Sequence, residues 1–324
     1  MMKPSSRVGI FWSLAIVLIG IDSPALLAQQ ADRDLLEAID VAGRRQAHEI
    51  QSARVVFKYR NGGAREQLSG PKVDAAIEKL RRAMEIEDLP SSRKAFQKVV
   101  EELTGGDQWS EVLLVQQGES IRNRRTFPQS EISNDFATHA DHRTYYWNEN
   151  GLQQAEIESK DQPAKRVIKS LTFLRPVFAD PGDRWKVIPA NSTGTVTIGR
   201  TEKLPLFFSF DTQSNVMTQW VIGTPATNYM VRGGLTTYPG EIVMPTYGFN
   251  ITVLDDKVRT FEAFLIEKAE YNIQLGDQEV HLQVPEKTRM IDSRDPQKKL
   301  YFHAPREDDA LTLADENLAK RKAK

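Results

Sequence analysis

The sequence contains one local group of side chains with the types and spacing to bind a metal ion. His139 and His142 lie three positions apart, and Asp135 shortly precedes them. Imidazole and carboxylate groups are common zinc ligands, but a zinc site usually needs three or four ligands with supporting neighbours. The stretch has the polar composition of a loop ahead of a strand. We therefore interpret it as a solvated loop, predict no metal site, and interpret His281 as an ordinary surface residue.

Other catalytic chemistry lacks motif support. The chain has no cysteine, which excludes disulfides, thiolate metal sites and cysteine nucleophiles. No Gly-x-Ser-x-Gly elbow, phosphate-cradling glycine loop or dinucleotide fingerprint follows an expected strand. The sequence therefore predicts a protein that is not an enzyme and uses no cofactor. A hydrolase whose residues are distant in sequence stays open as an alternative.

The charge balance argues against a nucleic-acid partner. The 324 residues include 43 Lys and Arg and 44 Asp and Glu, a net charge of −1, so the chain has no global basic field. Arg122, Arg124 and Arg125 form a small basic patch near Phe127. We interpret that patch as a solvated strand edge, with contact to anionic lipid headgroups or polysaccharide as the alternative.

Residues 1–28 have the pattern of a secretory signal peptide. Lys3 and Arg7 precede a nearly unbroken apolar run from Val8 to Ile21, and Ala28 supplies a small residue at the end. The run is shorter than the ~20 residues that span a bilayer, although an uncleaved anchor stays open. Together with the lack of cysteine, this pattern predicts export to the periplasm or cell envelope of a bacterium. The chain is expected to be soluble after signal removal.

The remaining chain divides into helical and β-rich parts. Val73, Ile77, Leu80 and Met84 recur at helical spacing. From Trp109 onward, short alternating runs separated by turn signals predict antiparallel strands. We expect a single α+β domain over 29–305, consisting of N-terminal helices packed against a large curved antiparallel sheet. The expected parts are a helix-rich 29–105, a β-rich 106–305 that closes with a hairpin of strands 270–275 and 279–284, and a flexible charged tail over 306–324.

Several expected strands are apolar on both faces, most clearly 204–211 and 216–222. Such a sheet must be covered on both sides. One interpretation is a core filled by the protein's own side chains, and the other is a hollow that holds an acyl chain or a lipid-modified peptide. The candidate lining residues of that hollow are Phe57, Tyr59, Leu113, Val115, Phe208, Phe210, Trp220 and Ile222.

Five short segments carry a resemblance to a known family: the strand 52–59, the aromatic strand and turn 144–151, the strand 208–211 that ends in aspartate, the closing asparagine, apolar strand and proline within 271–285, and 290–292. They resemble the LolA/LolB-like superfamily of exported lipoprotein carriers and lipoprotein-sorting proteins. The resemblance implies an incomplete, strongly curved antiparallel barrel, helices that plug its mouth, and an apolar interior that holds acyl chains. The carrier's interior arginine cannot be matched to a single arginine of this chain, so no functional residue is carried over.

These observations support two functional hypotheses. In the first, an exported, non-enzymatic protein binds an apolar or lipid-like ligand, either an acyl chain or a lipoprotein, in the hollow of a curved sheet. In the second, the chain is a structural or interaction module of the cell envelope with a filled core, no small ligand and a protein partner.

Overall fold

The structure is a computed structural model that describes residues 34, 37, 49–62, 68–128, 130, 132–139, 142–161, 186–188, 194–200, 206–223, 228–295, 297, 299–305 and 310–322. The predicted signal peptide lies outside this set. Residues 165–178, whose sequence pattern is compatible with a short helix, also lie outside it. Among the described residues, none of the helices combines the length and the apolar character needed to cross a membrane.

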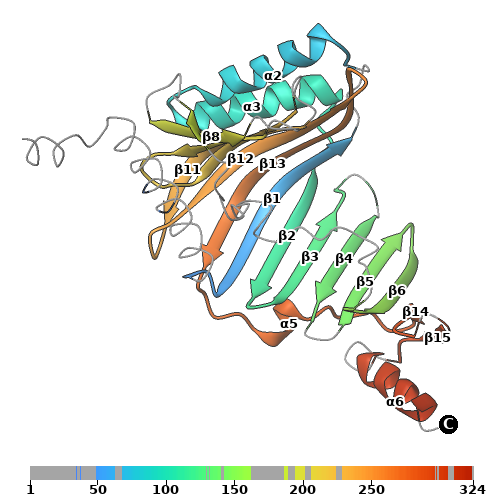
Figure 1. Cartoon of the computed structure of the whole chain (residues 1–324). Coiled ribbons are helices and arrows are strands. Elements are labelled where there is room, and N and C mark those ends of the chain that lie inside the picture. Colours follow the sequence, from blue (N-terminus) through green and yellow to red (C-terminus); the bar gives the residue numbers. More distant parts are fainter. Residues whose placement is uncertain are drawn as a thin grey trace, which may run out of the picture.

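The described strands form one continuous, strongly curved sheet of fifteen (Figure 1). Their order is β15-β14-β6-β5-β4-β3-β2-β1-β13-β12-β11-β10-β9-β8-β7. The β14–β6 pair is parallel and the other neighbouring pairs are antiparallel. The strands are β1 (Ser52–Gly62), β2 (Ser110–Gln117), β3 (Ser120–Thr126), β4 (Ser133–Thr138), β5 (His142–Glu149), β6 (Leu152–Ser159), β7 (Lys186–Ile188), β8 (Thr195–Arg200), β9 (Leu206–Asp211), β10 (Met217–Ile222), β11 (Asn228–Tyr238), β12 (Ile242–Leu254), β13 (Lys257–Tyr271), β14 (Arg289–Asp292) and β15 (Leu300–His303).

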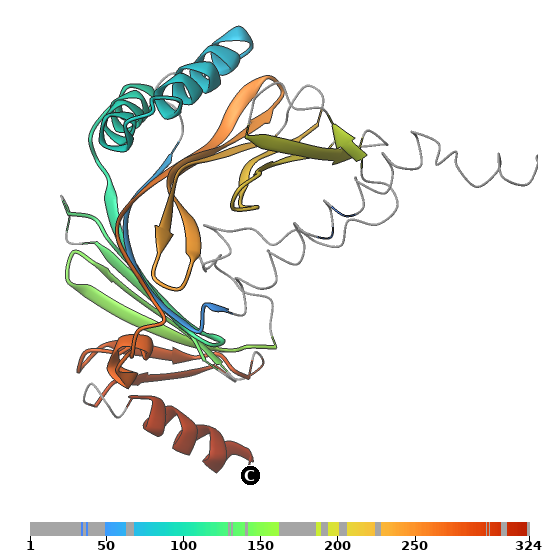
Figure 2. The same ribbon diagram turned by 90° about the vertical axis from the view of Figure 1, so that its left-hand side faces the viewer.

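The sheet has a concave face inside its curve and a convex face outside it (Figure 2). Strand β1 shows how alternation assigns residues to the two faces, because successive side chains point to opposite sides. Phe57 and Tyr59 are buried on the concave face, whereas Lys58 lies on the convex face. The predicted α+β fold, a large curved antiparallel sheet with helices packed against it, is confirmed.

Two adjacent helices follow β1, α2 (Pro71–Met84) and α3 (Leu89–Thr104). The carboxylate of Asp88 accepts a hydrogen bond from the Ser91 backbone N–H at 2.9 Å and caps α3, with Pro90 in the first turn. Gly105 ends α3 at a φ of 74°, which favours glycine. Residues 85–88 therefore separate the two helices, and the aspartate at their end caps the second one.

Helices α2 and α3 pack on the convex face (Figure 2). Leu80 and Phe96 are fully buried and pack with Tyr247, Phe249 and Leu265, all of which point to the convex side of β12 and β13. The resemblance implied helices that plug the hollow of the sheet. These two helices instead cover its outer surface, because the apolar stripe of each helix matches the convex residues of β11 to β13.

The β11–β12 hairpin bends away from β13 and covers part of the concave face. The pairing of β12 with β13 reaches no further than Tyr247, while β11 and β12 stay paired to the tip of the hairpin. Gly234 has a φ of 61°, and a Cβ there would lie 2.3 Å from the Thr246 hydroxyl. The bend therefore requires glycine. It brings Ile242 and Met244 into the core cluster of β1.

The closing hairpin expected over 270–284 is wrong. Strand β13 ends at Tyr271, where Asn272 adopts a φ of 53°. The following segment contains only the short helix α5 (Asp277–Val280), and it crosses the convex face of β2 and β3. Its alternating apolar residues pack against the sheet: Ile273, Leu275 and Val280 near Val115, and Leu282 and Val284 further along.

Helix α6 (Ala310–Lys322) forms within the segment expected to be a flexible tail. Ala314 is fully buried against the core beside β6 and β14. The Arg294 guanidinium connects the helix to the sheet, since it lies 2.6 Å from the Asp315 carboxylate and 2.9 Å from that of Asp292.

Candidate functional site

On the concave face, residues that are paired from strand to strand form one line across eight neighbouring strands, which we call the register row. Paired residues lie on the same face, so the pairing places Trp220 between Met230 and Phe208, and Ile198 beyond Phe208. On the other side of Met230, the row becomes polar. From β1 to β7 the row reads Asn61, Glu262, Asn250, Met230, Trp220, Phe208, Ile198 and Val187.

Six of the eight sequence-predicted lining residues lie on the concave face. They are Phe57, Tyr59, Phe208, Phe210, Trp220 and Ile222. Leu113 and Val115 lie on the convex face, because Leu113 pairs with Val56 and Val115 with Arg54. Their neighbours Val112 and Leu114 occupy the concave positions of β2 and are buried. Since this run is apolar at every position, its composition could not assign the faces.

The six concave residues fall into two groups with different accessibility. Phe57 and Tyr59, 0% and 2% exposed, lie in the core cluster that includes the bent hairpin. The second group lies at the β8–β10 end, where the Phe208 and Trp220 rings stack with centroids 6.0 Å apart. Phe208, Trp220 and Ile222 are only half-buried. Of these six residues, the partly accessible ones therefore lie at the β8–β10 end of the concave face.

A buried arginine lies between the two groups. Arg232 is 3% exposed and faces the concave side of β11. Its side chain passes over Gly248 on β12, and its guanidinium carbon lies 4.9 Å from the ring centroid of Phe264 on β13. Its Nη1 donates to the backbone carbonyl of Phe249 at 3.2 Å. Burial lowers the pKa of Arg232, and the Glu262 carboxylate opposes that shift.

Glu262 is the centre of a polar group at the β1–β12 end of the row. The carboxylate of Glu262 accepts a hydrogen bond from the Tyr59 hydroxyl at 2.5 Å. It accepts a second hydrogen bond from the Asn250 side-chain amide at 3.1 Å. Burial, with a smaller contribution from Glu262, raises the pKa of Tyr59. The guanidinium carbon of Arg125 lies 4.9 Å from the ring centroid of Tyr59. The Nε of Arg125 donates a hydrogen bond to the Ser110 hydroxyl at 2.8 Å. Burial lowers the pKa of Arg125.

The sequence analysis identified neither Arg232 nor the polar group around Glu262. A signal for Arg232 was present, because extending the alternation of the strand through Met230 places Arg232 on an apolar face, immediately before Gly233 and Gly234. Arg122, by contrast, lies on the convex face with its guanidinium 2.7 Å from the Asp135 carboxylate. The basic patch of β3 is therefore split between the two faces.

The candidate metal ligands lie at the β4–β5 hairpin. The rings of His139 and His142 have centroids 4.6 Å apart, and His281 stacks on His139 at 5.0 Å. Asp135 instead pairs with Arg122. Within the described ranges, no group of three or more His, Cys, Asp or Glu residues is arranged to hold a metal ion.

No protein-family model and no curated protein matches this sequence. Among solved structures, the fold is similar to a Vibrio parahaemolyticus domain assigned to the outer membrane lipoprotein-sorting proteins, with a TM-score of 0.40, 7% identity, and coverage of 74% of this chain and 94% of that chain. It is also similar to a LolA superfamily protein from Nitrosomonas europaea (TM-score 0.38, 10% identity, 76% and 97% coverage) and to MucB (0.24, 10%, 78% and 63%).

Proposed function

We propose that this chain is a non-enzymatic, exported protein that binds an apolar or lipid-like ligand, an acyl chain or the lipid of a lipoprotein, at the β8–β10 end of its concave face. The observation that carries the proposal is the half-buried apolar surface of Phe208, Trp220 and Ile222. Covering apolar surface contributes roughly 25 cal/mol per Å² without requiring directional contacts, which suits a flexible acyl chain.

The polar part of the register row fits the other end of such a ligand. A lipid combines an apolar chain with an ester or carboxylate head. Arg232 and the polar group around Glu262 follow the apolar residues in the order of the strands. A buried guanidinium is a strong hydrogen-bond donor for carboxylate or ester oxygens. We therefore expect the chain of the ligand over Trp220 and its head toward Arg232.

A second candidate function is favoured by the middle of the concave face, around β1. Phe57 is fully buried, and Ile242 and Met244 of the bent hairpin pack in the same cluster. That part of the face is a filled core. If the whole face behaves in this way, the chain is a structural or interaction module of the cell envelope with a protein partner and no small ligand.

A titration with a fluorescent long-chain fatty acid tests the first proposal against the second. Trp220→Ala and Phe208→Ala are expected to weaken binding about tenfold, because each removes apolar contact area on the ligand side. Leu113→Ala is the matched control. It truncates a partly buried apolar side chain on the convex face and should leave the affinity within about twofold.

Thermal unfolding of each variant separates loss of binding from loss of folding. The proposal predicts that all three variants unfold cooperatively and that only the concave variants lose affinity. Saturable binding that Leu113→Ala weakens as much as Trp220→Ala, or no binding to the wild-type chain, would favour the filled-core module.

A further inference from the structure

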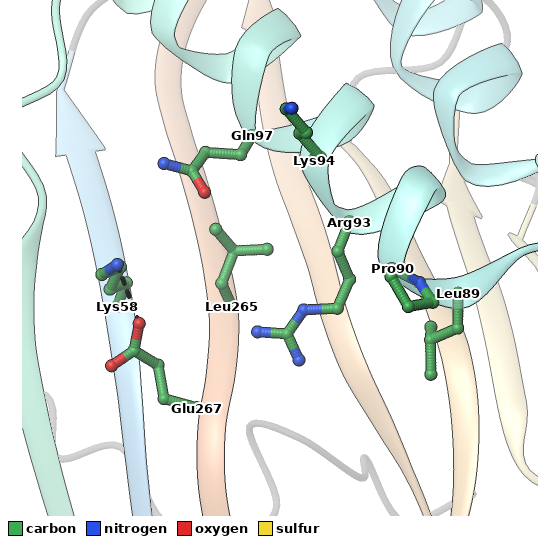
Figure 3. A pocket seen from close by; sticks show the side chains of 8 residues that line it. All are labelled: Lys58, Leu89, Pro90, Arg93, Lys94, Gln97, Leu265 and Glu267. Carbon is green, nitrogen blue, oxygen red and sulfur yellow. Dashed lines mark ion pairs between the residues drawn. The ribbon is translucent and has the colours of Figure 1, made fainter.

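A groove of about 510 Å³ lies on the convex face, along the side of α3 that faces β1 (Figure 3). Its floor comes from β1 and β13 and its wall from the first half of α3. The buried side chain of Leu265 lies at its centre. The groove lies on the face opposite the proposed lipid site. The lining residues are Lys58, Leu89, Pro90, Arg93, Lys94, Gln97, Leu265 and Glu267.

The groove has an excess of positive charge. Lys58 and Glu267 form an ion pair at 2.8 Å, so the carboxylate is already neutralised. The Arg93 guanidinium points into the groove (Figure 3). Within the part of the chain that the structure describes, Arg93 and Lys94 form no side-chain ion pair or hydrogen bond. Two cations beside an apolar floor are thus available for an external anion.

We propose that this groove binds an acidic, extended peptide segment of a partner protein. The two unpaired cations, Arg93 and Lys94, both come from α3, and the apolar floor at Leu265 lies between Arg93 and the Lys58–Glu267 ion pair. A chain with carboxylates alternating with apolar residues can place its carboxylates on these cations and cover Leu265 and Leu89 with its apolar side chains. A single phosphate or lipid headgroup would leave that apolar floor uncovered.

Fluorescence anisotropy tests the proposal with a rhodamine-labelled decapeptide that has glutamate at alternate positions and leucine or serine between them. The double variant Arg93→Gln, Lys94→Gln should bind about tenfold more weakly, because it removes both unpaired cations. Glu267→Gln should bind more tightly, because it releases Lys58 and removes the groove's negative charge. Lys98→Gln, an exposed α3 lysine outside the groove, is the matched control and should change affinity less than twofold.

Further binding measurements distinguish an acidic peptide from other anions that could occupy the groove. Replacing the glutamates of the probe by lysine should abolish binding, and raising the salt concentration should weaken it. The proposal is overturned if the peptide does not bind, if Lys98→Gln weakens binding as much as the double variant, or if millimolar inorganic phosphate displaces the peptide completely. It is also overturned if vesicles of phosphatidylglycerol bind through Arg93 and Lys94 while the peptide does not. Fatty-acid binding by the double variant should equal that of the wild type, which separates this site from the concave one.

Discussion

The side chain of Arg232 on β11 lies against the α-carbon of Gly248 on β12. The two residues are register partners, and a Cβ at Gly248 would lie 3.0 Å from Cδ of Arg232. The missing side chain leaves the space through which the guanidinium reaches the ring of Phe264. The glycine therefore positions the buried charge of the concave face.

Gly248→Ala should lower the free energy of unfolding by about 1–3 kcal/mol. The added methyl group would lie 2.4 Å from the Val231 backbone carbonyl oxygen, and a strand backbone cannot give way as a flexible side chain can. Urea unfolding monitored by circular dichroism measures the change. Gly62→Ala on β1 is the control, since nothing lies within 4 Å of its added Cβ, and it should shift stability by less than about 0.5 kcal/mol. Equal effects of the two substitutions would contradict this account of Gly248.

Tyr59 should make the stability of the protein fall in alkaline solution. In the unfolded chain its phenol ionises near pH 10. Burial raises the pKa of Tyr59 in the folded state. Above about pH 10 the unfolded state therefore binds fewer protons than the folded state, and the free energy of unfolding decreases as pH rises. Below pH 10 this contribution is constant.

Tyr59→Phe removes that proton difference. In urea unfolding between pH 9 and 11, the free energy of unfolding of the variant should fall less steeply with pH than that of the wild type above pH 10. The difference between the two slopes should approach about 1.4 kcal/mol per pH unit. Burial also raises the pKa of Tyr271, so some slope should remain in the variant. An unchanged slope would show that the Tyr59 phenol ionises alike in both states.

Ser92 and Tyr247 should be energetically coupled. The buried Ser92 hydroxyl has one proton, so donating it to the Ala83 carbonyl at 2.8 Å leaves its oxygen to accept from Tyr247 at 2.6 Å. Ser92→Ala should cost about 1–3 kcal/mol because it leaves the tyrosine hydroxyl unsatisfied. In a double-mutant cycle with Tyr247→Phe, we expect a coupling energy above about 0.5 kcal/mol. Additive effects would argue against the contact between α3 and the convex side of β12.

Helix α6 should detach when a charge enters its contact with the sheet. Ala314 is fully buried, so Ala314→Asp places a carboxylate against apolar neighbours. Amide hydrogen exchange over 310–322 should accelerate on the order of tenfold, while exchange of the central strands stays unchanged. Ala319→Asp is the matched control, because Ala319 is exposed on the same helix. Equal acceleration by both variants would mean that α6 is not held through Ala314.

Local signals predicted much of the sheet and the helix pair. Asn150 and Gly151 form the two-residue turn between β5 and β6 with φ values of 51° and 84°, as the Asn-Gly pair favours. Strand β4 was missed because Ser133–Thr138 has no apolar alternation, and its polar Asp135 is satisfied by Arg122 from β3. Only the neighbouring strand makes that sequence suitable for a sheet.

Which face of the sheet a residue occupies was predictable only where polarity alternates. The pattern of β1 separates Phe57 and Tyr59 from Lys58, but the run around Leu113 and Val115 has no polar residue to mark one face. The segment after Tyr271 alternates like a strand because its apolar residues pack against the convex face, although it forms no ladder. Tertiary packing can produce a period of two without strand pairing.

Quenching of Trp220 fluorescence by a brominated stearate tests the central claim most directly, because bromine atoms quench only at contact range. If the β8–β10 end of the concave face holds the acyl chain, saturating ligand should quench the wild-type protein and leave Trp220→Phe largely unquenched, with the affinity of that variant measured in parallel by the fluorescent fatty acid. Equal quenching of the two proteins, or none at saturation, would contradict a ligand site over Trp220.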